Sequence, residues 1–210
     1  MRDHGLSEQA ANIVMPTLDD LPVENRDIYR GQNGYERYSG DGVSPMPVPG
    51  GSGAYIANGS EHDPVGDTTH LPIRHIEMTQ RRFNKLKVFD DGPYESENTD
   101  HSIAVMTWGG SKGPTREAYD QMMSKGLEIG WYYTMQINPL PAKLLEELKQ
   151  KDLVIVPELN YLGQLSMLLR SKGVNAESIT QYTGTPFKVD DLVSKLTNRL
   201  HDAKKDLVKA

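Results

Sequence analysis

The chain has 210 residues, of which 37% are hydrophobic and 25% are charged, and its formal net charge is −6 at pH 7. This length suits one ordinary globular domain with additional chain, and the acidic balance offers no broad positive field for nucleic acid or an anionic membrane. Because the sequence has no cysteine, it excludes disulfides, thiolate zinc sites, cysteine nucleophiles and a cysteine-ligated iron–sulfur cluster within this chain.

Residues 1–70 are predicted to form an extended arm. The first residues contain no apolar stretch behind a basic start, and no later run approaches the length of a membrane span, so we expect a cytoplasmic protein. Between Gly31 and Gly66, glycine and proline are frequent and the apolar residues follow neither a strand nor a helix period, which predicts irregular structure. The apolar residues are nevertheless too frequent for a solvated linker, so we expect the arm to lie on a surface such as that of a partner. They are Val43, Met46, Val48, Tyr55 and Ile56.

Residues 71–100 are predicted to form a basic helix and an acidic hinge. From Leu71 to Lys87, apolar residues recur at helical spacing among an excess of basic residues, which indicates a basic amphipathic helix. The apolar positions are Ile73, Ile76, Phe83 and Leu86, and the basic ones are Arg74, Arg81, Arg82, Lys85 and Lys87. Asp90 to Asp100 is acidic, without a basic residue, and includes Gly92 and Pro93, so we expect a solvated hinge.

Residues 101–210 alternate short apolar runs with helical patterns, which predicts an α/β domain with an open, mostly parallel sheet and flanking helices. Four strands are expected, at Ile103–Trp108, Leu127–Met135, Leu153–Val156 and Ser178–Tyr182. Four helices are expected as well. The first has Pro114 near its start and Gly126 at its end, and the second buries Leu144, Leu145 and Leu148. The third helix (Tyr161–Lys172) buries Leu162, Leu165, Leu168 and Leu169. The last helix starts near Asp190 and buries Leu192, Val193, Leu196, Leu200 and Leu207.

Two candidate sites lie at loops that follow predicted strands. The turn Gly109, Gly110, Ser111 and Lys112 stands between a strand and a helix, where backbone amides and a helix start can hold a phosphate or carboxylate. A tight turn that needs glycine is the simpler alternative. Polar and small residues also follow the third strand, where α/β sheets place ligands or partner contacts, although Asn160 can equally serve to cap the next helix. They are Glu158, Asn160, Gly163 and Gln164.

Three stretches together resemble the C-terminal half of the alpha subunit of 2-oxoacid:ferredoxin oxidoreductases, particularly those called 2-oxoglutarate synthases. They are GSEHDPVGDTT with MTQRRFNKL, TWGGSKGPTREA with INPLP, and VIVPELNYLGQLSMLLRS with TGTPFKVDDL. The opening RDHGLSEQ is similar to the end of that family's thiamine-pyrimidine domain, and Met15–Pro22 is similar to the linker that follows this domain. The resemblance implies that residues 1–70 follow a missing pyrimidine domain, that 71–100 form the helix and hinge, and that 101–210 form a transketolase C-terminal-like domain.

The resemblance also implies a function for the complex. The family oxidatively decarboxylates a 2-oxoacid, here 2-oxoglutarate, on thiamine diphosphate, transfers the acyl group to coenzyme A and reduces ferredoxin through iron–sulfur clusters. This chain would hold none of the cofactors, including Mg²⁺, itself. It would assemble and stabilise the active site with the beta subunit and the missing N-terminal part of the alpha subunit, and would not be catalytic alone.

Within the resemblance, the loop with His62, Asp63 and Gly66 is a candidate for a proton donor or a contact to a substrate carboxylate, because histidine titrates near neutrality. A loop pinned by hydrogen bonds is the alternative. No catalytic residue and no metal site is assigned, because the spacing of His62, His70 and His75 fits no standard zinc pattern. Three other functions stay open: a free-standing α/β ligand-binding module, a structural interaction module, and the C-terminal domain of a transketolase or 2-oxoacid dehydrogenase.

Overall fold

The computed structural model describes residues 17, 27–31 and 34–209, and of the last helix it describes side chains up to residue 206. The opening RDHGLSEQ, the linker Met15–Pro22 except Thr17, and the side chain of Leu207 therefore lie outside the described residues. The chain forms two compact units, Met1–Arg82 and Phe83–Ala210, which are described separately. Among the described residues, no helix is long and apolar enough to cross a membrane.

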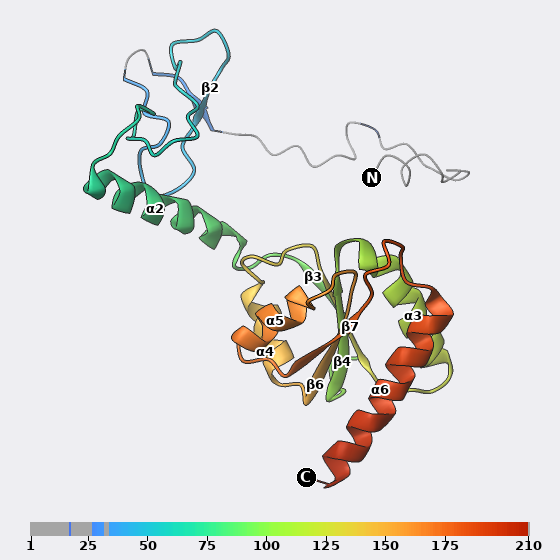
Figure 1. Ribbon diagram of the computed structural model, residues 1–210. Coiled ribbons are helices and arrows are strands. Elements are labelled where there is room, and N and C mark those ends of the chain that lie inside the picture. The colour runs from blue at the N-terminus through green and yellow to red at the C-terminus, as the bar shows by residue number, and fades with distance from the viewer. Residues whose placement is uncertain (1–16, 18–26, 32–33, 210) are drawn as a thin grey trace. The chain divides into compact units, whose positions relative to one another are not determined.

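The second unit contains a five-stranded sheet in the order β3-β5-β4-β6-β7 (Figure 1). The strands are β3 (Tyr94–Glu97), β4 (Ile103–Trp108), β5 (Gly130–Thr134), β6 (Leu153–Glu158) and β7 (Ala176–Thr180). β4, β5, β6 and β7 pair in parallel, and β3 is antiparallel to β5. All residues of β5 and β6 are buried, as expected for strands covered on both faces. The predicted open, mostly parallel α/β sheet is confirmed.

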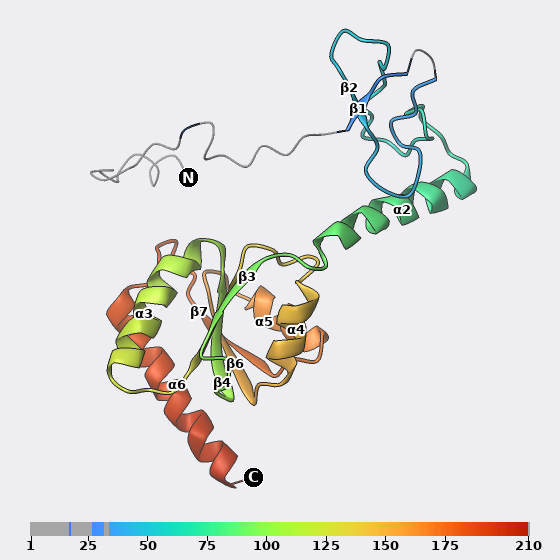
Figure 2. The ribbon, with the colours of Figure 1, turned by 180° about the vertical axis from the view of Figure 1, so that it is seen from behind.

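Helices cover both faces of this sheet (Figures 1 and 2). α3 (Lys112–Ser124) and α6 (Val189–Lys209) pack on one face, and α4 (Ala142–Lys149) and α5 (Gln164–Ser171) pack on the other. Each pair of helices packs on one apolar cluster of the sheet. There are two clusters because alternate residues of a strand point to opposite faces of the sheet. The first cluster contains Trp131, Tyr119 and Leu196, and the second contains Met106, Leu148 and Leu169.

The acidic segment before β4 is not simply the solvated hinge that its charges predicted. Residues Tyr94–Glu97 form the edge strand β3, whose four residues pair with Thr134 to Trp131 of β5. Glu95 and Glu97 form ion pairs with Lys112 and Arg116 of α3, while Tyr94 packs on the opposite face. This alternation of faces is the period expected of a strand. The strand was missed because its outward side chains are acidic, and charged side chains are common on an exposed edge strand, where they prevent pairing with another chain.

The helix after β6 is shorter than predicted. α5 begins at Gln164 rather than at Tyr161, so Leu162 lies in the preceding loop with 61% of its surface exposed and was wrongly assigned to the core. Leu165 and Leu169 are buried, and Leu168 packs partly against the second apolar cluster. The helix ends as predicted at Gly173, whose φ of 87° is left-handed.

The first unit contains little regular structure before its helix. Two-residue strands β1 (Ile28–Tyr29) and β2 (Met46–Pro47) pair in parallel, and the helix α2 (Pro72–Leu86) closely matches the predicted basic helix. A short 3₁₀ helix, η2 (Lys87–Phe89), follows in the second unit. The irregular segment folds back on itself through a series of aromatic contacts. The paired rings are Tyr29–Tyr35, Tyr35–Tyr55, Tyr38–Tyr55 and Tyr38–His62.

Candidate functional site

A cavity lies beside the carboxyl ends of the neighbouring strands β4 and β6. After β4 the chain passes through α3 to β5 on one side, and then through α4 to β6 on the other side of β4. Open α/β sheets bind ligands outside such a reversal of strand order. The cavity has a volume of about 320 Å³ and is lined by Trp108, Gly109, Gly110, Ser111, Leu159, Asn160 and Gln164.

The turn on the β4 side leads directly into α3. Gly109–Ser111 form a 3₁₀ turn, and the hydroxyl of Ser111 does not cap the helix although the residue stands at the N-cap. Ser111 is 5% exposed. The side chain of Lys112, predicted as part of the anion-binding turn, is directed elsewhere. Its ammonium group lies 2.5 Å from Glu95 Oε1 and 4.3 Å from the centre of the Tyr133 ring, because β3 supplies a carboxylate that the sequence analysis placed in a hinge.

The loop on the β6 side is held by side-chain caps. Glu158 is fully buried, and its carboxylate accepts the backbone N–H groups of Leu165 at 2.7 Å and Ser166 at 3.0 Å. Asn160 Oδ1 accepts the N–H groups of Gly163 at 2.7 Å and Gln164 at 3.1 Å, which confirms the capping alternative for this residue. Asn160 Nδ2 also donates to Glu158 Oε2 at 2.9 Å. Glu158 therefore compensates the positive end of α5.

Gly163 serves the geometry of this loop. Its φ is 68°, and an added Cβ would lie 2.5 Å from Ser178 Oγ. The position therefore excludes a larger side chain, because both the backbone conformation and the close approach to β7 need glycine. Gly163 and Glu158 are structural neighbours of the cavity and do not line it, whereas Asn160 and Gln164 do.

The structure thus brings the two predicted sites of the second unit together in one cavity. Sequence reasoning considered the turn and the β6 loop separately and missed Trp108 and Leu159. Both residues lie at the carboxyl end of a predicted strand, beside a predicted site residue. The strand order was the missing information, because only the pairing of β4 with β6 makes the ends of these two strands adjacent.

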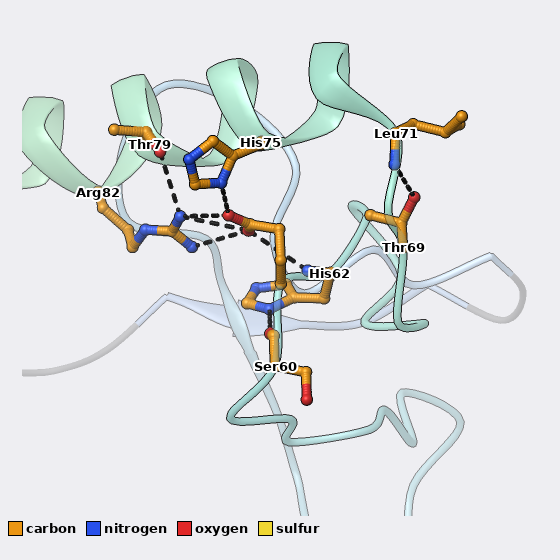
Figure 3. Close-up of polar contacts among 8 residues, drawn as sticks. Ser60, His62, Thr69, Leu71, His75, Thr79 and Arg82 are labelled. Carbon is orange, nitrogen blue, oxygen red and sulfur yellow. Dashed lines mark hydrogen bonds and ion pairs between the residues drawn. The ribbon is translucent and has the colours of Figure 1, made fainter.

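In the first unit, polar contacts converge on Glu61, the residue before the predicted site residue His62. Figure 3 shows its partners Arg82, His75 and His62. Arg82 Nη2 donates to Glu61 Oε2 at 2.9 Å, and both terminal guanidinium nitrogens of Arg82 donate to Oε1 at 3.2 Å. His75 Nδ1 also contacts Oε2. The hydrogen bonds from Arg82, and then the contact with His75, lower the pKa of Glu61 from 4.5 to about 2. Sequence reasoning missed Glu61, although the basic helix spacing could have suggested an acidic partner.

The predicted residues of this loop have mainly structural contacts. His62 is 9% exposed, contacts the ring of Tyr38 in a tilted arrangement with ring centres 4.1 Å apart, and places Nδ1 2.8 Å from the carbonyl oxygen of Ser60. Since a carbonyl only accepts, Nδ1–H is the donor in this contact. Asp63 Oδ1 accepts three backbone N–H groups at 3.0 Å each, from residues 65–67. Gly66 has a φ of 102°, and an added Cβ would lie 2.6 Å from the Ile56 carbonyl oxygen.

The basic face of α2 is largely used within the unit. Arg81 is 4% exposed and donates to the Ser39 carbonyl oxygen at 3.2 Å and to Ser44 Oγ at 2.7 Å. Arg82 pairs with Glu61 and Arg74 pairs with Glu77. Arg81, one of the basic positions of the predicted amphipathic helix, is therefore buried, because the irregular segment covers it.

The family resemblance implies a Mg²⁺ ion and an iron–sulfur cluster in the complex. The described residues of this chain contain no group of three or more histidine, cysteine, aspartate or glutamate side chains arranged for a metal ion. The whole sequence lacks the cysteines that an iron–sulfur cluster of the ordinary kind needs.

Comparisons with known proteins give one consistent result. A 2-oxoacid:ferredoxin oxidoreductase alpha subunit of Aeropyrum pernix is 31% identical over 177 residues, which cover 77% of this chain and 27% of that protein. A 2-oxoglutarate oxidoreductase subunit KorA of Mycobacterium tuberculosis is 33% identical over 143 residues, covering 67% of this chain and 21% of that protein. No family model matches the chain.

A solved structure extends this similarity to the fold. It is the 2-oxoglutarate:ferredoxin oxidoreductase from Magnetococcus marinus with 2-oxoglutarate, coenzyme A and succinyl-CoA bound. The match has a TM-score of 0.77 and 31% identity, and it covers 90% of this chain and 34% of that chain. These comparisons confirm the resemblance to part of an alpha subunit. The chain spans between about a fifth and a third of the length of these three proteins.

Proposed function

We propose that this chain, which is related to part of the alpha subunit of 2-oxoacid:ferredoxin oxidoreductases, serves as a non-catalytic component of such an enzyme complex. The observation that carries the proposal is the similarity to a solved 2-oxoglutarate:ferredoxin oxidoreductase over 90% of the chain at 31% identity, and the sequence relatives are named as alpha subunits or KorA. The reaction we propose for the complex is the oxidative decarboxylation of 2-oxoglutarate to succinyl-CoA, with reduction of ferredoxin in the cytoplasm. Thiamine diphosphate, Mg²⁺ and the iron–sulfur cluster would reside on other parts of the complex, and coenzyme A would act there as acyl acceptor.

The role of this chain is assembly. Its first unit leaves several large apolar side chains exposed, and such side chains can contribute to a contact with another protein. Ile73 and Ile76 of α2 are 58% and 52% exposed, although their helical spacing predicted a buried stripe. Other exposed residues of this unit are Ile28, Val43, Val48, Ile56 and Leu71. In the complex, the remaining part of an alpha subunit covers these side chains, since the related proteins contain a long region that this chain does not match.

A capture experiment tests this assembly. The tagged chain is used as bait in an extract of its native cell, and the partners are identified by mass. We expect recovery of a cysteine-rich, thiamine-diphosphate-binding partner, with coenzyme A-dependent oxidation of 2-oxoglutarate in the eluate. Recovery of the bait without such a partner would contradict the proposal.

Two matched variants of the bait locate the contact on α2. Ile76 and Gln80 are both exposed on this helix. We expect Ile76→Ser to reduce capture about tenfold, which corresponds to the loss of one buried aliphatic side chain at an interface. Gln80→Ser should leave capture unchanged. Equal capture by the two variants would exclude the apolar residues of α2 as the contact.

A further inference from the structure

The helix α3 starts beside the cavity, and no side chain accepts a hydrogen bond from the first N–H groups of this helix. The first amides of a helix have no partner within the helix, and they attract negative charge. At α5 this role is taken by the buried carboxylate of Glu158, which accepts two of the first N–H groups. At α3 neither the 3₁₀ turn nor the helix has a side-chain cap. An anionic group in the cavity is therefore attracted to the start of α3.

Ser111 gives independent evidence for a ligand at this place. Its side chain lines the cavity, although only 5% of the residue is exposed. The hydroxyl does not cap α3, and within the described part of the chain it has no other hydrogen-bond partner. It is therefore available to a hydrogen-bond acceptor bound in the cavity.

The turn also has room for the close approach of a ligand. An added Cβ at Gly109 or Gly110 would meet no atom within 4 Å, so open space lies above the backbone of both residues. The volume of about 320 Å³ is at the lower end of the usual range for small-molecule sites. A compact ligand fits this space.

The remaining lining residues favour a planar ring. The indole of Trp108 and the side chain of Leu159 line the apolar part of the cavity. Aromatic side chains bind flat rings by stacking. The exposed amide of Gln164 offers both a donor and an acceptor for the edge of such a ring.

We infer that this cavity binds a phosphomonoester attached to a planar ring, of the class of nucleoside monophosphates. The phosphate lies at Gly110 and Ser111 at the start of α3, and the ring lies against Trp108. The inference concerns the chain alone and does not depend on the assembly proposed above. It also assigns no step of the oxidoreductase reaction to the cavity.

The test uses the complete 210-residue chain and the fluorescence of Trp108. The sequence has two tryptophans, and the other one, Trp131, is fully buried in the first apolar cluster, outside the cavity lining. Adenosine monophosphate is the probe, with adenosine and inorganic phosphate as its two separate halves. We expect a saturable change with a Kd below about 1 mM for adenosine monophosphate, competition by phosphate, and at least tenfold weaker binding of adenosine.

Two glycines provide a matched pair of variants. Neither Gly110 nor Gly113 has a left-handed φ, and an added Cβ at either position would meet no atom within 4 Å, but only Gly110 lines the cavity. We expect Gly110→Ala to weaken binding about tenfold because the methyl group occupies the phosphate position, and Gly113→Ala to change it by less than about twofold. Equal affinities of the two variants would overturn the inference.

The hydroxyl of Ser111 supplies a second, independent variant. Ser111→Ala should weaken binding about threefold to tenfold, which is the usual effect of one lost hydrogen bond. If the Gly110→Ala variant shows no cooperative thermal transition, it is not folded, and the affinity of Ser111→Ala for adenosine monophosphate becomes the test. An affinity of Ser111→Ala equal to that of the wild type would then overturn the inference. Absence of a saturable signal, or equal binding of adenosine and adenosine monophosphate, would overturn it as well.

Discussion

The two units of this chain are stabilised by different kinds of contact. In the second unit, two apolar clusters on opposite faces of one sheet contain nearly all of the large buried side chains. In the first unit, the main contacts are tilted and edge-on tyrosine pairs and a few polar groups around Arg81 and Glu61. Apolar burial is shared by many residues, whereas a polar contact depends on its two partners. Single substitutions should therefore affect the two units differently.

The largest effect is expected in the core of the second unit. Leu196 on α6 is fully buried in the first apolar cluster. Leu196→Ala should lower the free energy of unfolding by about 2–5 kcal/mol, because it removes apolar contacts and leaves a cavity. Chemical denaturation followed by Trp131 fluorescence measures this loss. Asn198→Ala, at an exposed position of the same helix, should change stability by less than about 0.5 kcal/mol. Similar losses in both variants would contradict the described packing of α6.

A smaller loss is expected from Glu158, a buried polar group that caps α5 beside the cavity. Glu158→Gln keeps the shape of the side chain but replaces one acceptor oxygen by a donor, which then faces one of the two N–H groups, that of Leu165 or that of Ser166. We expect a loss of about 2 kcal/mol in the free energy of unfolding. Glu146→Gln, at an exposed position of α4, is the control. A stability unchanged from the wild type would show that Glu158 does not cap α5.

In the first unit, Arg81→Met should produce a local effect. The substitution retains an apolar stem but leaves the Ser39 carbonyl oxygen and Ser44 Oγ without their donor. We expect chymotrypsin to cleave the tyrosine-rich segment about tenfold faster, while the unfolding of the second unit stays unchanged. Gln80→Met, at an exposed position of the same helix, should not change the cleavage rate. Faster unfolding of the second unit would contradict the division into two units.

The smallest effect concerns the pH dependence of the first unit. Because the pKa of Glu61 is lowered from 4.5 to about 2, the contact with Arg82 contributes stability that is fully present above about pH 4.5. This contribution is lost as the pH falls from about 4.5 through 2. Carboxyl carbon shifts in an NMR titration should report the low midpoint of Glu61. Arg82→Ala should move the midpoint upward, and an unchanged midpoint would exclude Arg82 as the main cause.

Much of the second unit was predictable, because its strands and helices each bury an apolar face with a regular period. Ile103–Trp108 has the bounds predicted for the first strand, and Gly173 ends α5 as expected. β3 was missed because its exposed residues are acidic, and Leu162 was misplaced because Asn160 and Glu158 cap the helix only after it. In the first unit, α2 has the predicted helical period but the segment from Gly31 to Gly66 has none. The contacts that this irregular segment makes with Arg81, and those of Glu61, were therefore not predictable from the pattern.

The candidate cavity was predicted only in parts. Gly110, Ser111, Asn160 and Gln164 were identified from loops that follow predicted strands, which is where α/β sheets place their sites. Their convergence depends on the pairing of β4 with β6, and the sequence pattern does not specify which parallel strands are neighbours. The uncompensated start of α3 is likewise a property of the fold, since Ser111 has the residue type of a cap and does not act as one.

The most direct test of the central claim is reconstitution of the enzyme complex with and without this chain. The complementary alpha-subunit part and the beta subunit are purified separately, and the coenzyme A-dependent reduction of ferredoxin by 2-oxoglutarate is measured. The account predicts that activity appears only when this chain is added and that the chain alone is inactive. The same rate in the absence of this chain would contradict the claim that it is a component of a 2-oxoacid:ferredoxin oxidoreductase.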